Sequence, residues 1–277
     1  MITGVLRIRG LDDPRIADYR GIADAALVRS RGLFVAEGRA VVRRLIEDGR
    51  YPVRSVLVSD AAYRALETIL APAARQTPAY LCQAGDFLGI TGHDLHRGCL
   101  ALAERPPAPT VADLLTPIVA RTRAGGARAT IVVLEGISNA DNVGGVFRNA
   151  AAFGADAVVL SPTCCDPLYR KAIRTSMAAT LRVPYARAAE WPGDLERIRR
   201  DGFTILALTP RPPSITIDEL ADRPRPPHIA WLVGTEGEGL TAAAASLADH
   251  HVRIPIEPEV DSLNLAVAVG IALQRLR

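Results

Sequence analysis

Apolar and polar positions follow two different patterns along the chain. Between residues 32 and 105, helical spacing of apolar residues alternates with short β-branched runs, which predicts helices over about 36–48 and 61–70 and a strand over 53–59. The strings "AYLC" and "GCLALAE" predict two further strands, with a short helix near Asp86 between them. The pattern in this part of the chain therefore predicts a small α/β domain.

Strands without polar alternation dominate the chain beyond residue 128. "ATIVVLEG", "ADAVVLSP", "FTILALTP" and "HIAWLVG" are separated by helical segments such as "NVGGVFRNAAAFG" and "KAIRTSMAATL". Uninterrupted apolar strands between helices predict a parallel sheet covered on both faces, whose ligands bind at the carboxyl ends of the strands. The proline-rich segment "RPPAPTVADLLTP" predicts a linker. We expect an N-terminal extension (1–31), a first domain (32–105), a linker (106–127) and a second domain (128–277).

Composition agrees with a globular protein of two domains. The chain has 277 residues, 49% of them hydrophobic, which is enough for sizeable cores. The longest apolar run, residues 265–273, is too short to span a bilayer, and "MITGVLRIRG" has no apolar stretch of signal-peptide length. We therefore expect a cytoplasmic protein that does not bind membranes.

The charge is distributed unevenly. Residues 1–105 carry 15 arginines against 12 acidic residues, a surplus of +3, whereas residues 106–277 carry 18 basic and 18 acidic residues. The surplus favours an anionic partner for the N-terminal part.

The four cysteines form no C-x-x-C pair, and two of them are adjacent, so no disulfide framework and no four-thiolate zinc site is predicted. His93, His96 and Cys99 have a spacing that a metal could use, but no second ligand cluster lies nearby in the sequence. We expect no metal site.

Two of the loops that follow predicted strands carry polar side chains that packing does not require. In "EGISNADNVGGVFRNAAAFG", Asn142 and Gly144 lie at the start of a predicted helix, where free backbone N–H groups favour an anion or a polar ligand. Arg148 lies further along this helix, either as a functional group or as an arginine extending into solvent. In "WLVGTEGEGL", Glu236 stands among glycines that permit tight turns and close approach of a ligand: Gly234, Gly237 and Gly239.

A third loop, "RIPIEPEVDSLNLAV", leads into the final helix, whose polar opening has two explanations. Asp261 or Ser262 would cap this helix by accepting a hydrogen bond from its first turn. Asn264 is predicted to lie inside that turn, where asparagine forms helix poorly, so a functional role competes with capping. No G-x-G-x-x-G follows a strand and no G-K-[ST] is present, which excludes a dinucleotide fingerprint and a P-loop.

Together the three loops resemble the signature motifs of the SpoU-type (TrmH-like) RNA 2′-O-ribose methyltransferases, of the SPOUT class. The first motif, N-x-G followed by R-x-A, is matched over residues 142–150, and the second, G-x-E-x-x-G, over residues 234–239. The third, I-P followed by S-L-N, is matched over residues 254–264. The segment "GLFVAEGRAVVRRLI" is similar to the L30e-like substrate-binding domain that many members carry. Thr235, where many members have asparagine, and the acidic "EPEVD" depart from the family pattern, so the RNA is not identified.

The resemblance implies an α/β fold in which the C-terminal parallel sheet forms a trefoil knot, an exception to the usual absence of knots. A small L30e-like α/β domain that binds the RNA would precede this catalytic domain. The methyl donor would be S-adenosyl-L-methionine, held by backbone groups of Gly234, Ile254 and Leu263, and the acceptor a ribose 2′-hydroxyl of rRNA or tRNA. The catalytic domain would form a homodimer, in agreement with the apolar residues that surround the final helix.

The resemblance also assigns roles to individual side chains. Ser262 and Asn264 would orient the nucleotide or Arg148, and Asn142 would hold Arg148 or the adjacent phosphate. Glu236 would fix its loop. In this family the arginine at the position of Arg148 is often given the role of general base. Because a guanidinium stays protonated and is a poor base, we expect Arg148 instead to clamp a phosphate and stabilise negative charge on oxygen. The general base is not assigned.

Two other functions are compatible with parts of the pattern. A non-catalytic RNA-binding protein could use the basic N-terminal part and dimerise through the second domain, but the presence of Arg148, Ser262 and Asn264 favours an enzyme. A nicotinamide-dependent oxidoreductase could use a parallel sheet, but the chain lacks its phosphate-binding fingerprint.

Overall fold

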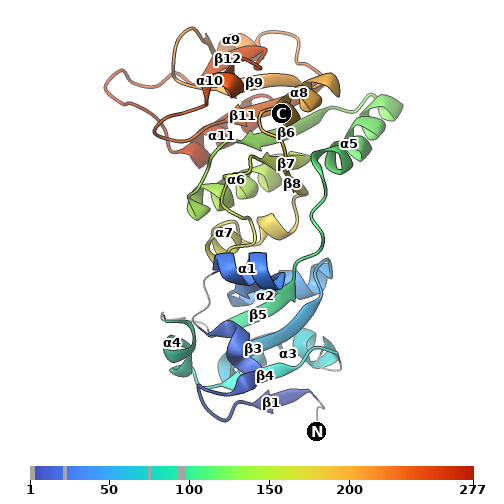
Figure 1. Ribbon diagram of the computed structural model, residues 1–277, viewed down its shortest axis with the longest axis vertical. Helices are drawn as coiled ribbons and strands as arrows, with labels where there is room; N and C mark the ends of the chain where they lie inside the picture. Colours follow the sequence, from blue (N-terminus) through green and yellow to red (C-terminus); the bar gives the residue numbers. More distant parts are fainter. Residues whose placement is uncertain (1–3, 21–23, 74–75, 93–97) are drawn as a thin grey trace. The chain divides into compact units, whose positions relative to one another are not determined.

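The computed structural model describes residues 4–20, 24–73, 76–92 and 98–277, and the chain divides into two compact units (Figure 1). The first unit contains Met1–Pro107 together with Asp166–Leu181, and the second contains Ala108–Cys165 together with Arg182–Arg277. Within the described ranges, no helix is both long and apolar enough to cross a membrane.

The first unit is built on a five-stranded sheet with the order β1-β4-β3-β5-β2. Strands β1, β4 and β3 run parallel, whereas β5 runs antiparallel to β3 and β2. The strands are β1 (Val5–Arg7), β2 (Leu33–Glu37), β3 (Val53–Ser59), β4 (Ala79–Cys82) and β5 (Cys99–Glu104).

Seven helical segments lie in the described part of the first unit. The segments are η1 (Pro14–Tyr19), α1 (Asp24–Arg31), α2 (Arg39–Asp48), α3 (Asp60–Ala73), α4 (Asp86–Thr91), α7 (Arg170–Thr175) and η2 (Ala179–Leu181).

Tyr19 is buried among the residues that pack on one face of this sheet. Its hydroxyl donates to the Ser55 carbonyl (2.9 Å) and accepts from the Leu102 N–H (3.2 Å).

Two elements of this unit differ from the sequence expectation. The helix expected from residue 36 begins at Arg39, because Ala36 and Glu37 belong to β2 and Gly38, at φ +99°, separates strand from helix. All five residues of β2 are buried, so the strand shows no polar alternation. The expected extension, residues 1–31, contains β1, η1 and α1, and β1 adds a parallel strand beside β4.

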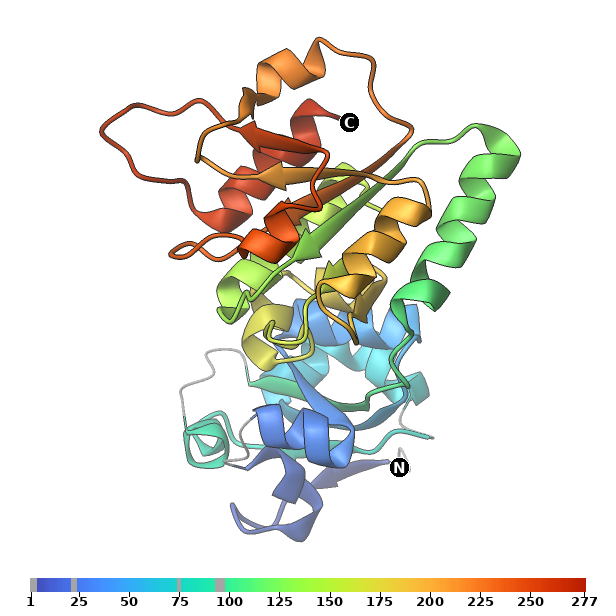
Figure 2. The ribbon, with the colours of Figure 1, turned by 45° about the horizontal axis from the view of Figure 1, so that its top comes forward.

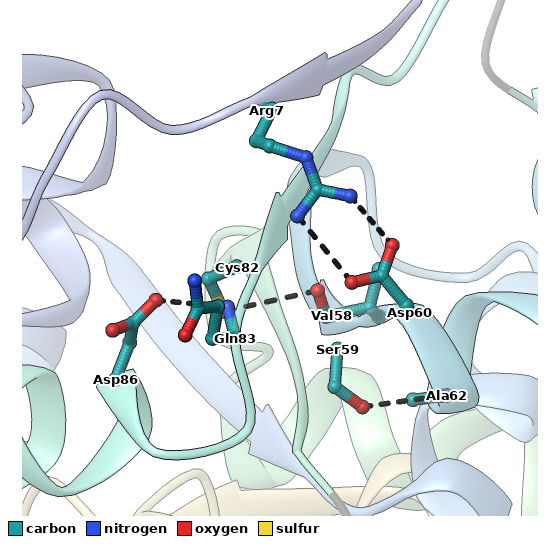
Figure 3. A network of polar contacts seen from close by, with 8 residues as sticks. All are labelled: Arg7, Val58, Ser59, Asp60, Ala62, Cys82, Gln83 and Asp86. Carbon is teal, nitrogen blue, oxygen red and sulfur yellow. Dashed lines mark hydrogen bonds and ion pairs between the residues drawn. The ribbon is translucent and has the colours of Figure 1, made fainter.

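The carboxyl ends of the three parallel strands meet in a network of polar contacts (Figure 3). Arg7, at the end of β1, donates to both carboxylate oxygens of Asp60, at the start of α3 (2.7 and 3.3 Å). Beyond β4, the Gln83 N–H donates to Asp86 (2.8 Å). Since the Arg7 and Asp60 side chains are about half exposed, their ion pair contributes little stability.

The second unit contains a seven-stranded sheet in which every pair of neighbouring strands is parallel, in the order β10-β12-β9-β11-β6-β7-β8. The prediction of a parallel sheet is confirmed, whereas the trefoil knot stays a prediction. The strands are β6 (Ala129–Leu134), β7 (Ala157–Leu160), β8 (Tyr185–Arg187), β9 (Thr204–Leu208), β10 (Ile215–Thr216), β11 (His228–Val233) and β12 (His250–Arg253).

Helices cover both faces of this sheet (Figure 2). Buried residues of α5, α8 and α10 pack on one face with Ile131 and Val133, so the alternate residues Val132 and Leu134 point to the other face. There α6 and α11 pack against each other and contact β7 and β11. The helices are α5 (Val111–Gly125), α6 (Ala140–Phe153), α8 (Gly193–Arg200), α9 (Ile217–Ala221), α10 (Ala242–Ala245) and α11 (Leu265–Arg275).

The segment expected as a linker, residues 106–127, contains helix α5. Thr110 and Asp113 form a capping box at its start, and Leu114 and Leu115 are buried against the sheet. The prolines that precede Thr110 obscured this helix in the sequence, and Pro117 lies within it.

The segment "KAIRTSMAATL", expected to cover the second sheet, is grouped instead with the first unit. Arg170, directly before this segment, donates to Asp24 through its backbone N (2.9 Å) and its Nε (2.7 Å). Arg174, within the segment, donates to Glu37 (3.0 Å). Helical periodicity predicts that such a segment is a helix, but does not identify the surface it packs on.

Candidate functional site

The three motif segments of the second unit meet at Asn264. The Asn264 Nδ2 donates to Asn142 Oδ1 (3.1 Å) in α6 and to Glu236 Oε1 (3.2 Å) in the glycine-rich loop after β11. Glu236 Oε1 also accepts from the Leu265 N–H (3.4 Å) at the start of α11. Asn142 is buried, whereas Glu236 and Asn264 are exposed, so the network lies at the edge of the core.

Asn264 is the N-cap of α11, which corrects the sequence interpretation. Its Oδ1 accepts from the N–H groups of Ala266 (3.0 Å) and Val267 (3.3 Å), and the helix begins at Leu265. Neither Asp261 nor Ser262 caps the helix, and Asn264 does not lie inside the first turn. An asparagine amide can cap through oxygen and donate through nitrogen at the same time, so Asn264 both starts α11 and joins the two other motifs.

Close packing of α6 and α11 places these segments together. A Cβ on Gly145 would lie 2.6 Å from the Ala266 Cβ, and one on Gly270 would lie 3.0 Å from Asn149 Nδ2. Asn149 Nδ2 also donates to the Ala266 carbonyl (2.5 Å). Gly145 in α6 and Gly270 in α11 therefore permit the close approach of the two helices that brings Asn142 within hydrogen-bonding distance of Asn264.

A cavity of about 450 Å³ opens at the carboxyl ends of β9, β11 and β12. Its size and its place at the strand ends are typical of ligand sites in parallel sheets. The sequence-predicted residues that line it are Gly234, Glu236, Ile254, Ser262 and Leu263.

Gly234 is required by the shape of the glycine-rich loop itself. A Cβ at this position would lie 2.3 to 2.5 Å from backbone atoms of Gly239 and Leu240. Thr235 and Gly239 exchange backbone hydrogen bonds of 3.1 and 3.2 Å, which closes the loop, and Gly239 has φ +78°. The sequence suggested that glycine keeps a side chain away from a ligand; in the structure, the close neighbour of Gly234 is the returning backbone.

Sequence reasoning missed the part of the cavity wall that follows β9. Residues 209–213, "TPRPP", line the cavity, with Arg211 between two prolines, and His251 of β12 lines it as well. The rule that ligands bind at the ends of parallel strands could have found this segment, because it follows a predicted strand as directly as the glycine-rich loop does.

Glu135 directly follows β6 and holds the end of the glycine-rich loop, where the loop leads into α10. This carboxylate is 5% exposed; its Oε1 accepts from Trp191 Nε1 (2.6 Å) and from the Thr241 hydroxyl (2.8 Å), and its Oε2 accepts from the Thr241 N–H (2.9 Å). Thr241 is the N-cap of α10 and follows Leu240 of the cavity wall. Three donors to one buried carboxylate hold the end of the loop in place.

Arg148 lies on the exposed part of α6 and does not line the cavity. It lies six positions after Asn142, so its side chain is rotated by about 240° around the helix, away from Asn264. Across the described ranges, its guanidinium has no hydrogen-bond or ion-pair partner. The structure thus joins Asn142, Glu236 and Asn264 directly and leaves Arg148 free for a ligand.

The structure tests the metal candidate only in part. Among the described residues, no group of three or more His, Cys, Asp or Glu side chains is placed to hold a metal ion. His93 and His96 lie outside those residues, and Cys99 is a buried residue of β5.

Known proteins resemble this chain over nearly its whole length. A protein of Mycobacterium bovis described as an uncharacterized tRNA/rRNA methyltransferase is 40% identical over 265 residues, which are 94% of this chain and 88% of the relative. The solved AdoMet-bound rRNA methyltransferase from Sinorhizobium meliloti aligns with a TM-score of 0.80 and 24% identity, over 99% of this chain and 97% of that one. A solved RNA 2′-O ribose methyltransferase aligns with a TM-score of 0.73 and 24% identity, over 98% and 97%.

The sequence profile of the SpoU rRNA methylase family matches residues 129–274, which contain all three motifs, the cavity and the Asn264 network. The match covers more than half of the chain and coincides with the seven-stranded sheet and α6 to α11. This chain belongs to the SpoU rRNA methylase family.

Proposed function

We propose that this RNA methyltransferase of the SpoU family uses S-adenosylmethionine to methylate a ribose 2′-hydroxyl of ribosomal or transfer RNA. The observation that carries the proposal is the convergence of the three motif segments on Asn264, beside a cavity at the strand ends. The AdoMet-bound Sinorhizobium meliloti enzyme and the RNA 2′-O ribose methyltransferase, which share the fold, support it.

The cavity suits S-adenosylmethionine in size and in chemistry. Its volume of about 450 Å³ lies in the range of small-molecule sites. Apolar residues of its wall, such as Val233 and Leu240, offer contacts to an adenine ring, and backbone groups of Gly234, Ile254 and Leu263 can hydrogen-bond to the edge of the base.

The bound donor supplies an electrophilic methyl group on a sulfonium, and the residues of the chain bind and orient the acceptor. Ser262, at the cavity wall, can hold the 2′-hydroxyl or the neighbouring phosphate through its own hydroxyl. Asn264 and Asn142 fix the start of α11, which begins three positions after Ser262. Orientation of this kind lowers the entropic part of the barrier.

Arg148 takes the role of an RNA clamp in this proposal. Its exposed, unpaired guanidinium can bind a phosphate through two parallel hydrogen bonds and can stabilise negative charge on the 2′-oxygen. A guanidinium stays protonated at neutral pH, so Arg148 is not assigned the proton of the hydroxyl.

Single-turnover methylation with saturating donor and RNA tests the proposal. Arg148→Ala and Ser262→Ala should each lower the rate by at least about tenfold while leaving donor affinity nearly unchanged, because neither residue forms the adenosine contacts. Arg148→Lys should remain impaired, since it keeps the charge but loses the planar fork. Methyl groups mapped to a base instead of a ribose would contradict the 2′-O assignment. Absence of donor binding would favour a non-catalytic RNA-binding protein.

The proposal includes a homodimer and an RNA-binding first unit. Val267 and Ile271, one turn apart on α11, are 51% and 37% exposed, which is unusual for aliphatic side chains of a packed helix and suits a second copy of the chain. Residues 1–105 carry the surplus of +3, so RNA affinity should fall as salt screens phosphate contacts.

A further inference from the structure

The cavity of the second unit contains a guanidinium to which the three motifs assign no role. Arg211 lies between Pro210 and Pro212 in the segment after β9, and its backbone N donates to the Thr209 hydroxyl (3.2 Å). Among the residues that line the cavity, Arg211 is the only arginine or lysine and Glu236 is the only carboxylate. The flanking prolines restrict the backbone, so the position of the cation is largely preset.

Glu236 and Arg211, the two charged residues of the cavity wall, differ in their hydrogen bonds. Glu236 accepts hydrogen bonds from Asn264 and from the Leu265 N–H and is held against α11. The Arg211 side chain has no hydrogen bond or ion pair to any residue that the structure describes. Its guanidinium lies beside Gly239, with its carbon and both terminal nitrogens 3.8 to 4.0 Å from the position that a Cβ there would take. The cation is thus placed at the cavity wall with its donors free.

We propose that Arg211 binds the carboxylate of the amino-acid part of S-adenosylmethionine; the inference rests on the proposed function. At neutral pH the donor carries two positive groups, the sulfonium and the ammonium, and one negative group, the carboxylate. A guanidinium repels the first two and matches the planar carboxylate with two parallel hydrogen bonds. The amino-acid part of the donor therefore lies toward the segment after β9, and Arg211 determines which end of the ligand occupies that part of the cavity.

An RNA phosphate is the competing anion, and the position of Arg211 favours the donor. Arg211 lines the same cavity as Gly234, Ile254 and Leu263, whereas Arg148 lies outside it on α6. Arg211, which lines the cavity, is therefore placed to bind the donor, whereas Arg148, outside the cavity, is placed to bind a phosphate of the RNA.

Calorimetric titration of the full-length protein with two adenosine compounds tests the inference. S-Adenosylhomocysteine has the carboxylate and the ammonium on a neutral thioether, whereas 5′-methylthioadenosine lacks the whole amino-acid part. Arg211→Gln should weaken binding of S-adenosylhomocysteine by about tenfold or more, the effect of a lost hydrogen-bonded charge, and should change 5′-methylthioadenosine binding by less than about twofold. Arg211→Lys should bind S-adenosylhomocysteine with intermediate affinity, and Arg223→Gln, which removes the same charge from an exposed position outside the cavity, should bind both as the unaltered protein does.

Three results would overturn the inference. Equal losses for both compounds in Arg211→Gln would mean that the substitution disturbs the cavity as a whole. Unchanged binding of S-adenosylhomocysteine, with weaker RNA binding, would assign Arg211 to the RNA. If the unaltered protein bound neither compound, the proposed function would fail together with the inference, which distinguishes that case from the other two.

Discussion

Asn264 and Asn142 lie 122 positions apart in the chain and are joined by a hydrogen bond of 3.1 Å between Nδ2 and Oδ1. The same Asn264 side chain caps α11 through its oxygen. Capping and motif assembly therefore depend on different atoms of one amide, and substitutions can separate them.

Asn264→Ser should keep the cap and lose the amide NH2 group. Serine is as good an N-cap as asparagine, so the free energy of unfolding should change by less than about 0.5 kcal/mol, whereas Asn264→Ala should cost about 1 kcal/mol. Both substitutions should lower the single-turnover methylation rate by at least about tenfold, because neither side chain has the amide NH2 group that donates to Asn142 and Glu236 at the same time. Thr110→Ala, which removes the cap of α5, serves as the control: it should lower stability and preserve the rate. A normal rate for Asn264→Ser would show that capping alone explains Asn264.

Gly234→Ala should abolish donor binding, or weaken it by at least about tenfold. The new Cβ would lie 2.3 to 2.5 Å from backbone atoms of Gly239 and Leu240, so the loop that lines the cavity must move. Gly237→Ala is a matched control in the same loop, since a Cβ there meets no atom within 4 Å. Equilibrium dialysis with labelled S-adenosylmethionine measures both variants, and equal affinities would mean that the loop adapts without cost.

Glu135→Gln should destabilise the second unit and weaken donor binding. An amide nitrogen in place of one oxygen would face donors from Trp191 or Thr241, which costs about 1–3 kcal/mol for a buried polar group without a partner. Chemical denaturation measures the loss, and dialysis measures the donor affinity. Glu219→Gln, in the exposed capping box of α9, should have a much smaller effect on both. A stable Glu135→Gln variant with normal affinity would show that this anchor is dispensable.

The thiols of Cys82 and Cys99 should resist alkylation in the folded protein. Burial raises the pKa of each to about 12, so little reactive thiolate forms at pH 8. Figure 3 shows Cys82 at the end of β4, near the Val58 carbonyl, to which its Sγ lies at 3.8 Å. Mass spectrometry after iodoacetamide treatment should find both unmodified in the native protein and modified in denaturant. Rapid native labelling of either thiol would contradict the packing of the first unit.

Val267→Glu should convert the proposed dimer into a monomer, because an interface that covers this exposed side chain of α11 would have to bury an unpaired carboxylate. Light scattering at micromolar concentration measures the mass. Leu88→Glu, at a side chain that is 57% exposed on α4 of the first unit, should leave the mass unchanged. If the unaltered protein is itself a monomer at this concentration, the dimer proposal is wrong.

Most of the strands could be predicted from uninterrupted apolar runs, because a strand that is buried on both faces of a sheet has apolar side chains at successive positions. Strand β3 matches the predicted range, and β6, β7, β9 and β11 lie within predicted runs. Strand β1 has only three residues, and β2 joins α2 through Gly38, so neither produced a pattern of its own. The prolines before α5 were mistaken for a linker, although prolines are also common just before a helix begins.

The motif spacing predicted which loops carry the site but not the contacts inside it. Ser262, Leu263 and Gly234 line one cavity, as expected of segments at adjacent strand ends. The pairing of Asn142 with Asn264 depends on how closely α6 approaches α11, which no local pattern encodes. Arg211 was missed because a proline-rich loop resembles a simple connection in sequence, and only the folded sheet brings it beside Gly239.

The segment Asp166–Leu181 has a consequence for how this protein is made. Because the first unit consists of Met1–Pro107 and this later segment, its N-terminal residues leave the ribosome well before their unit is complete. Asp24 and Glu37 cannot pair with Arg170 and Arg174 until these arginines have been synthesised, more than 130 residues later. A gene rearrangement that moves residues 1–107 as one continuous block would separate Asp24 and Glu37 from Arg170 and Arg174.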